Sequence, residues 1–225
     1  MKPIPVIAID GPAASGKGAI AQAVAESLGF HYLDSGAIYR ATALAIDSAG
    51  KDAGSPDLLE ADAAAIAARM DLRFRDGMVF LGERNITDLI RSESCGTNAS
   101  KIAVLPLLRS ALLDLQRSFR RPPGLVAEGR DMGTVVFPDA GLKIFLSASV
   151  AVRAERRHKQ LMEKGINANI QNLLSDIEFR DERDRQRNVA PLRTGSDSKL
   201  IDTTALSLPQ SVAAVLKSYA LDVVI

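Results

Sequence analysis

The feature that most constrains this fold is a glycine-rich stretch between an apolar run and an amphipathic helix. Residues 6–9 are apolar, Gly11 to Lys17 has the spacing G-x-x-x-x-G-K, and 17–28 carries apolar side chains at helical spacing. Glycines let backbone N–H groups turn towards a phosphate, the helix adds its positive end, and Lys17 adds a point charge. The stretch predicts a strand, a phosphate-binding loop and a helix; the alternative is a structural glycine turn with a solvated lysine.

The loop departs from the general motif directly after its lysine. Gly18 and Ala19 stand where a serine or threonine would hold Mg²⁺, so no hydroxyl follows Lys17. We therefore expect the metal to be held through water or by a carboxylate from elsewhere in the chain.

The rest of the chain alternates short apolar runs with helical patterns, which predicts an α/β fold with a five-stranded parallel sheet and helices on both faces. The expected strands are 6–9, 31–35, 125–127, 142–146 and 200–202. The expected helices are 17–28, 36–50, 57–70, 104–120, 150–164, 169–187 and 208–219. Ligands bind such sheets at the carboxyl ends of the strands.

One segment breaks this alternation. Residues 71–87 alternate polar and apolar side chains, with turn signals at Asp76-Gly77 and Gly82-Glu83. This pattern predicts antiparallel strands inside an inserted lobe over 51–93. The core domain would then comprise 1–50 and 94–225.

Composition excludes several classes of protein. The 28 basic and 27 acidic residues leave a net charge of +1, so no global field attracts nucleic acid or membrane. A single cysteine, Cys95, excludes an intrachain disulfide, and no leader or membrane-spanning run is visible. We expect a cytoplasmic protein; the alternative is an organellar protein that has lost a transit peptide.

Polar residues follow the second expected strand. Asp34 or Ser35 is placed to cap a helix, which leaves their functional role open. Tyr39 and Arg40 are expected in the first helical turn, where a cation opposes the helix dipole. Arg40 is better explained there if it faces an anion.

An acid and an ion-forming pair follow the third expected strand. Glu128 ends the apolar run, and Arg130 and Asp131 lie in a glycine-flanked loop. Glu128 is placed to reach Mg²⁺ through water, and Arg130 offers a fork for phosphate. The alternative for Arg130 and Asp131 is a surface ion pair.

The helix expected over 169–187 changes character along one face. Its apolar stripe continues into Arg180, Asp181 and Asp184, with further arginines alongside. This indicates either a solvated helix end with i,i+4 ion pairs or a cleft whose arginines face phosphates. A second arginine cluster on the preceding helix, interpreted as part of a lid over about 153–168, comprises Arg153, Arg156 and Arg157.

These residue types favour phosphoryl transfer. The transition state spreads negative charge over the moving group, so a lysine and several arginines can position and neutralise it. No dedicated general base is evident, and an acceptor that is already an anion needs none. The sequence therefore favours a phosphate acceptor over an alcohol.

Four motifs, GPAASGKG, LDSGAIYR, GRDMGTVVFPDA and RDERDRQRNVAPL, occur in an order that resembles the bacterial cytidylate kinase family over nearly the whole chain. The resemblance implies transfer from ATP, with Mg²⁺, to CMP or dCMP, in a monomer with an enlarged monophosphate-binding insert. It implies that the ATP phosphates are bound by Gly11, Pro12, Ala13, Ala14, Ser15, Gly16, Lys17, Gly18 and Ala19, with Arg156 closing over ATP. It implies cytosine and sugar contacts from Ser35, Ser100, Asp131, Arg180 and Asp184. It implies that the acceptor phosphate and the moving group are held by Tyr39, Arg40, Arg109, Arg130 and Arg187.

Two residues depart from that family. Its members usually carry threonine at Ala19 and aspartate at Glu128, and we expect activity to survive both changes. Two rival hypotheses stay open: a shikimate-type kinase of a small alcohol, and a nucleotide-binding switch without transfer. The residues themselves leave Arg109 on a helix surface, so its role comes from the resemblance alone.

Overall fold

The structure is a computed structural model that describes residues 3–75, 77–163 and 165–223. It contains two compact units. The first comprises 1–33 and 119–225, and the second comprises Asp34–Ser118.

The first unit is built on a five-stranded parallel sheet with the order β2-β6-β1-β7-β8, as the sequence predicts. Its strands are β1 (Val6–Asp10), β2 (His31–Asp34), β6 (Leu125–Gly129), β7 (Leu142–Ser147) and β8 (Lys199–Asp202). The register pairs Ile9 of β1 with Glu128 of β6 and with Ile144 of β7. The loops that follow β1, β6, β7 and β8 therefore leave the same edge of the sheet.

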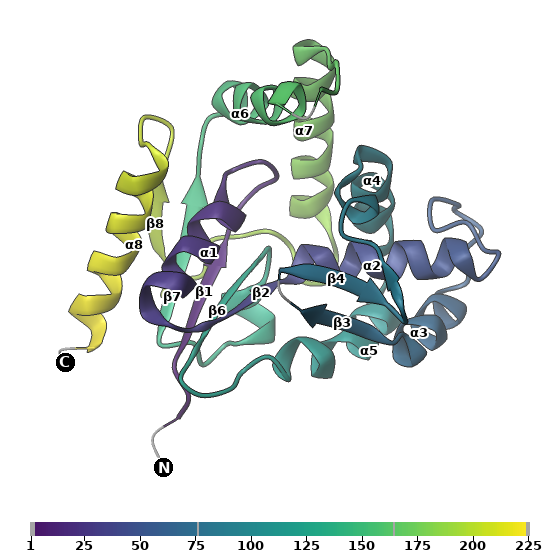
Figure 1. The fold of residues 1–225 in the computed structure, drawn as a ribbon, viewed down its shortest axis with the longest axis horizontal. Helices are drawn as coiled ribbons and strands as arrows, with labels where there is room; N and C mark the ends of the chain where they lie inside the picture. The colour runs from purple at the N-terminus through teal and green to yellow at the C-terminus, as the bar shows by residue number, and fades with distance from the viewer. Residues whose placement is uncertain (1–2, 76, 164, 224–225) are drawn as a thin grey trace. The chain divides into compact units, whose positions relative to one another are not determined.

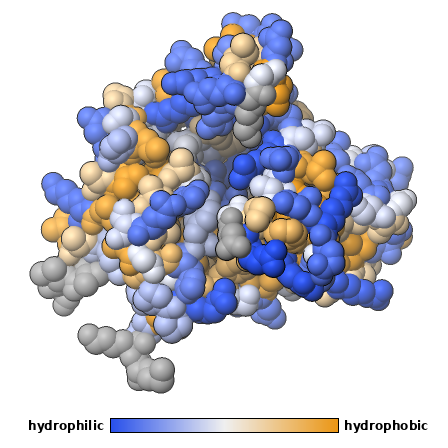
Figure 2. Space-filling view, in the orientation of Figure 1, coloured by the Kyte–Doolittle hydropathy of each residue, from blue (hydrophilic) through white to orange (hydrophobic). Residues whose placement is uncertain are grey.

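Helices complete this unit, and Figure 1 shows α1 and α8 beside each other and α6 beside α7. The helical segments are α1 (Lys17–Leu28), the π-helical turn η2 (Met132–Val136), α6 (Val150–Glu163), α7 (Ile170–Gln186) and α8 (Leu208–Val223). Apolar side chains of α1 and α8, such as Val24 and Val215, pack on Ile7, Ile9 and Ile144 of the sheet in one buried core. Figure 2 shows hydrophilic side chains over α6, whose sequence is rich in charge.

The second unit contains an antiparallel sheet and four helices among its described residues. Its elements are α2 (Ser35–Ser48), α3 (Glu60–Arg69), β3 (Leu72–Arg75), β4 (Met78–Leu81), β5 (Arg84–Asn85), the 3-10 turn η1 (Leu89–Arg91), α4 (Glu93–Ile102) and α5 (Pro106–Arg117). The strands pair in the order β3-β4-β5. Gly77 and Gly82 follow β3 and β4 at φ values of 73° and 57°, which suit glycine in a tight turn; Asp76 of the expected first turn lies outside the described residues.

The compact unit contains the expected lobe 51–93 and extends beyond it at both ends, because α2 packs on α3 and α4, and α3 packs on α5. Helix α4 was not expected at all, since its Ser-, Gly- and Asn-containing sequence has weak helix propensity. Its start is nevertheless marked by Ser92, whose hydroxyl accepts from the N–H of Cys95.

Candidate active site

The phosphate loop between β1 and α1 exposes uncapped backbone donors. Gly16 caps α1 in the left-handed region at φ 85° and offers no side-chain cap. Ala14 also has positive φ, at 56°. N–H groups at an uncapped helix start are the usual donors to a bound phosphate.

Lys17 lies inside this loop rather than in solvent. It is 8% exposed, donates from Nζ to the carbonyl of Pro12 at 3.2 Å, and lies 3.7 Å from Oε2 of Glu128. The Tyr32 hydroxyl donates to Oε1 of Glu128 at 3.3 Å. A Cβ at Gly18 would lie 3.1 Å from that oxygen, so the glycine makes room for the longer acid.

The phosphate loop also contains a buried hydroxyl group, that of Ser15. The Oγ atom of Ser15 has no hydrogen-bond partner in the described part of the chain, and Ser15 is 0% exposed. Buried polar atoms are normally satisfied. An acceptor arriving at this loop would supply the missing bond.

Asp10, at the end of β1, ties the phosphate loop to the loop that follows β6. Its carboxylate accepts from the N–H groups of Met132 and Gly133, each at 2.8 Å. Burial raises the pKa of Asp10 to about 6, opposed by the two backbone hydrogen bonds. The nearby Asp131 carboxylate also raises this pKa, and Lys17 lowers it. Asp10 is not among the site residues expected from the sequence, although an acid directly before Gly11 is a visible signal.

Arg130 and Asp184 form an ion pair between the β6 loop and α7. Arg130 Nε donates to Asp184 Oδ2 at 2.7 Å, and both side chains are largely buried. Burial raises the pKa of Asp184, but Arg130, Arg187 and Arg180 outweigh it and leave the pKa below 3.8. Burial lowers the pKa of Arg130, but Asp184 and then Glu128 raise it above its ordinary value.

This network excludes the surface-pair interpretation of Arg130. It brings together six of the residues expected from the sequence, because their charges act on one another's pKa or pair directly: Lys17, Glu128, Arg130, Arg180, Asp184 and Arg187. One face of the ionic end of α7, with Asp181 and Asp184, is therefore buried, while Glu182 and Arg185 on the other side are exposed and Arg185 lies 4.0 Å from Asp181. Arg187 follows the last residue of α7 and is 7% exposed.

Arg156 of α6 lies against the phosphate loop. Its guanidinium donates to the carbonyls of Thr203 at 2.6 Å and Leu206 at 3.3 Å, and to that of Ser15 at 3.5 Å. A Cβ built at Gly16 would lie 4.0 Å from its NH1 atom. Arg156 therefore lies beside the phosphate loop, at Ser15 and Gly16.

Arg153, from the same predicted cluster, differs from that expectation. It is 2% exposed and pairs with the buried Asp181 at 2.6 Å. A helical-wheel pattern cannot distinguish a buried arginine from a lid arginine, because the partner comes from another helix. Arg157 NH1 donates to the side-chain oxygen of Gln160, three residues further along α6, at 3.3 Å.

Several further candidate residues lie in the second unit. Asp34 caps α2 by accepting from the N–H of Ala37 at 2.9 Å, which confirms the capping role for Asp34. Ser35 is buried directly after it. Arg40 lies in the second turn of α2, not the first, and donates to the carbonyl of Ile90 at 2.8 Å.

Tyr39 and Arg109 lie together in this unit. The Arg109 guanidinium carbon is 5.7 Å from the centre of the Tyr39 ring. Arg109 also donates to the carbonyl of Ala103 at 3.1 Å and is 8% exposed, so it is not the helix-surface residue that its pattern indicated. Ser100 of α4 is 9% exposed, and its Oγ has no hydrogen-bond partner among the described residues.

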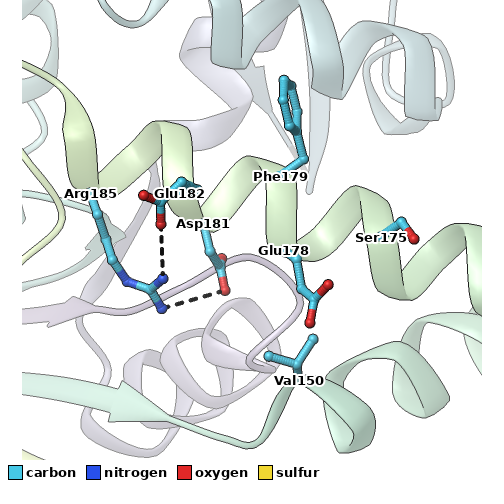
Figure 3. A pocket seen from close by; sticks show the side chains of 7 residues that line it. All are labelled: Val150, Ser175, Glu178, Phe179, Asp181, Glu182 and Arg185. Carbon is cyan, nitrogen blue, oxygen red and sulfur yellow. Dashed lines mark ion pairs between the residues drawn. The ribbon is translucent and has the colours of Figure 1, made fainter.

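A cavity of about 500 Å³ lies beside α7 (Figure 3). Its lining comprises Val150, Ser175, Glu178, Phe179, Asp181, Glu182 and Arg185. None of these was expected to bind substrate. Figure 3 shows Phe179 pointing away from the side of α7 that carries Glu178 and Asp181.

No cluster of three or more metal-ligand side chains occurs within residues 3–75, 77–163 and 165–223. Glu128 is a carboxylate within ion-pair distance of Lys17 in the phosphate loop. No helix in the same part of the chain is long and apolar enough to span a membrane.

Several known proteins are similar to this chain. A family model described as cytidylate kinase matches residues 7–221. A cytidylate kinase of Cupriavidus necator is 56% identical over 215 residues, 96% of this chain and 95% of that one. One of Polynucleobacter asymbioticus is 52% identical over 97% of this chain and 98% of its own. A solved gluconokinase from Sinorhizobium meliloti covers 98% of this chain and 97% of its own, with 14% identity and a TM-score of 0.44.

Proposed function

The chain belongs to the cytidylate kinase family, and from this premise we propose how its residues share the transfer of a phosphoryl group from ATP to CMP or dCMP. The activity yields ADP and CDP or dCDP. One observation carries the proposal: Lys17, Glu128, Arg130 and Asp184 form a continuous charged network at the edge where β1 and β6 end.

The ATP phosphates would be held by the loop from Gly11 to Ala19. Its uncapped N–H groups, the buried Lys17 and the unpartnered hydroxyl of Ser15 all suit an anion with several acceptor oxygens. Arg156 would lie over the same nucleotide, supported by its contact with the Ser15 carbonyl.

Mg²⁺ fits this site through Glu128. Mg²⁺ commonly keeps several waters and takes one or two carboxylates together with substrate phosphates. The Glu128 carboxylate beside Lys17, with Ala19 lacking a hydroxyl, matches that limited protein contribution. When bound, Mg²⁺ would neutralise phosphate charge; Glu128, oriented by Tyr32, would hold a water ligand of the metal.

The arginines would stabilise the transferring group. Arg130, Arg187 and Lys17 carry fixed positive charge in a largely buried network, where charge stabilisation is stronger than in water. The acceptor is a phosphate oxygen that is already anionic, so no side chain has to remove a proton. Asp184 would keep Arg130 oriented, because the pair bonds at 2.7 Å.

The acceptor nucleotide would be recognised by two sets of residues. The proposed base and sugar contacts are Ser35, Ser100, Asp131, Arg180 and Asp184. The proposed contacts to its phosphate are Tyr39, Arg40, Arg109, Arg130 and Arg187. The buried, unpartnered hydroxyl of Ser100 supports this assignment, since a polar nucleotide atom would satisfy it.

We also propose roles for larger segments. The unit Asp34–Ser118, which contains the expected insert 51–93, would bind the monophosphate, and 153–168 would form the lid. We expect a monomer located in the cytoplasm. Sedimentation of the purified protein measures its oligomeric state.

An acceptor panel tests the proposed function. CMP, dCMP, UMP, AMP and shikimate are offered with ATP and Mg²⁺, and ADP and the new phosphate product are quantified. We expect turnover with CMP and dCMP and none with shikimate. Phosphorylation of the alcohol, or saturable ATP binding without CDP formation, would instead support one of the two rival hypotheses.

A variant pair tests the acceptor site. Arg40→Met is expected to raise the KM for CMP roughly tenfold to hundredfold, because a charge-assisted hydrogen bond is lost, and to leave the KM for ATP unchanged. Arg69→Met, an exposed arginine of α3, is the matched control and should change neither constant. Equal effects of both variants would contradict the assignment of Arg40.

A further inference from the structure

One buried ion pair holds both backbone groups of a single residue in the phosphate loop. The N–H of Ala13 donates to Asp181 Oδ1 at 3.2 Å, and the carbonyl of Ala13 accepts from Arg153 NH1 at 2.8 Å. Arg153 NH2 and Asp181 Oδ2 are 2.6 Å apart. The Arg153 guanidinium, the Asp181 carboxylate and the backbone of Ala13 therefore form a closed ring of contacts.

Arg153 and Asp181 are among the most deeply buried charged residues of the first unit. Arg153 is 2% exposed and Asp181 is 1% exposed. The remaining edge of the Arg153 guanidinium donates from Nε to the carbonyl of Ala148 at 3.0 Å, just before α6. The fork of the arginine thus bonds to three different groups, which a lysine cannot reproduce.

The two side chains come from different helices. Arg153 lies on α6 and Asp181 on α7, at 140 and 168 positions from Ala13. Figure 3 shows Asp181 on α7, with Arg185 beside it; that more exposed guanidinium lies 4.0 Å from Asp181. Arg153 and Asp181 together define the Ala13 clamp.

The loop needs such a clamp because its backbone is unfavourable for its sequence. Ala14, directly after Ala13, has φ 56°, a left-handed conformation that L-residues other than glycine rarely adopt. Such conformations persist where surrounding contacts over-determine them. Fixing both the N–H and the carbonyl of Ala13 sets the two peptide planes that flank Ala13, and the second of these planes also contains the N–H of Ala14.

We propose that Arg153 and Asp181 are positioning residues that hold the phosphate loop in its anion-binding shape, so that ATP affinity depends on them. They act through the backbone of Ala13 and do not themselves need to touch the nucleotide. This inference rests on the proposed ATP site at the loop. A merely structural tie between α6 and α7 would predict lower stability with unchanged ATP affinity.

The decisive variant is Arg153→Lys, which keeps the charge beside Asp181 but removes the fork. We expect its KM for ATP and its ATP dissociation constant, measured by calorimetry, to rise roughly tenfold to hundredfold. The KM for CMP should stay within about twofold of the parent value. Hydrogen exchange at the Ala13 amide should accelerate in Asp181→Asn, because its acceptor is altered.

A double variant keeps the test valid if a single substitution prevents folding by leaving one buried charge without its partner. Arg153→Met/Asp181→Leu removes both buried charges at once, a change that buried pairs often tolerate, and it should weaken ATP binding in the same direction. Lys217→Met, at an exposed lysine of α8 that lies outside the proposed lid, is the control and should leave ATP binding unchanged.

Comparison with Lys17→Met distinguishes failure of the Ala13 clamp from failure of the proposed ATP site. If Lys17→Met leaves ATP binding intact, the proposed ATP site is wrong. If Lys17→Met weakens ATP binding while folded Arg153→Lys and the double variant retain parental affinity, the ATP site stands and the clamp is overturned.

Discussion

The two units of the molecule bury different kinds of polar group. In the first unit, five carboxylates are buried: Asp10, Glu128, Asp131, Asp181 and Asp184. In the second unit, none of the buried polar side chains that the structure describes is acidic; they are Ser35, Thr42, Ser100, Arg109 and Gln116. Arg40 and Arg109 there bond to backbone carbonyls, which are neutral.

This difference bears on how each unit meets a phosphate. In the first unit Lys17, Arg130 and Arg153 each lie within ion-pair distance of a carboxylate. Such pairs fix geometry, because a buried charge without its partner is costly. In the second unit, hydroxyl groups and arginine are available to recognise a ligand without a buried acid repelling it. The first unit is therefore expected to be sensitive to charge and pH, and the second to loss of single hydrogen bonds.

The largest effect should come from Lys17 in the first unit. Lys17→Met removes a buried cation from the phosphate loop and is expected to lower kcat by about a hundredfold to a thousandfold, the usual cost of losing one transition-state charge contact. Steady-state kinetics with ATP and CMP measure this. A rise in the KM for CMP with kcat and the KM for ATP unchanged would break the comparison, since it would assign Lys17 to the acceptor.

The pH dependence of stability should also belong to the first unit. Because the pKa of Asp10 is raised to about 6 from 3.8, the folded state binds this proton more tightly than the unfolded state. Its contribution to the free energy of unfolding should therefore fall as pH rises from about 4 to about 6, by about 2–3 kcal/mol. The lowered pKa of Asp184 acts in the opposite sense, with stability lost as pH falls below 3.8, outside this window.

Asp10→Asn isolates that contribution. Urea unfolding of the parent and the variant at several pH values gives the difference between their unfolding free energies, in which other titrating groups cancel. The difference should decline across the window as the Asp10 carboxyl ionises. A difference that stays flat with pH would show that Asp10 titrates normally in the folded protein.

The sequence predicted the parts of this architecture that depend on local pattern. Apolar runs followed by glycine, or by acid and glycine, located β1, β6 and the loops that follow them. The motif spacing located Lys17, and the break in alternation located β3 and β4. These features are encoded within a few neighbouring residues.

What the sequence could not predict depends on partners distant in the chain. Whether Arg153 lies in solvent or in the core is decided by Asp181, on another helix. Arg109 has the pattern of a surface residue, yet it lies over Tyr39. The unit boundary at Asp34 follows from helix packing and not from the composition of 51–93. Side-chain identity alone does not encode such pairings.

A matched pair of serines compares the units directly. Ser15 and Ser100 each bury an Oγ without a hydrogen-bond partner among the described residues. Ser15→Ala is expected to raise the KM for ATP, and Ser100→Ala the KM for CMP, each by roughly threefold to tenfold. Neither variant should lower the melting temperature, because only an unsatisfied hydroxyl is removed. A crossed result, with Ser100→Ala affecting ATP, would reverse the proposed division of substrates.

The smallest expected effect concerns Tyr32, which shares Glu128 with Lys17. Its hydroxyl bonds Glu128 at 3.3 Å, a long contact, so Tyr32→Phe should lower the free energy of unfolding by about 1 kcal/mol or less. The same variant should raise the Mg²⁺ concentration for half-maximal activity by about twofold to threefold, because Glu128 gains freedom. Glu128→Gln should raise it further, since the charge itself is lost. If Tyr32→Phe changed the Mg²⁺ requirement as much as Glu128→Gln, the hydroxyl and not the carboxylate would be the group that matters beside Lys17.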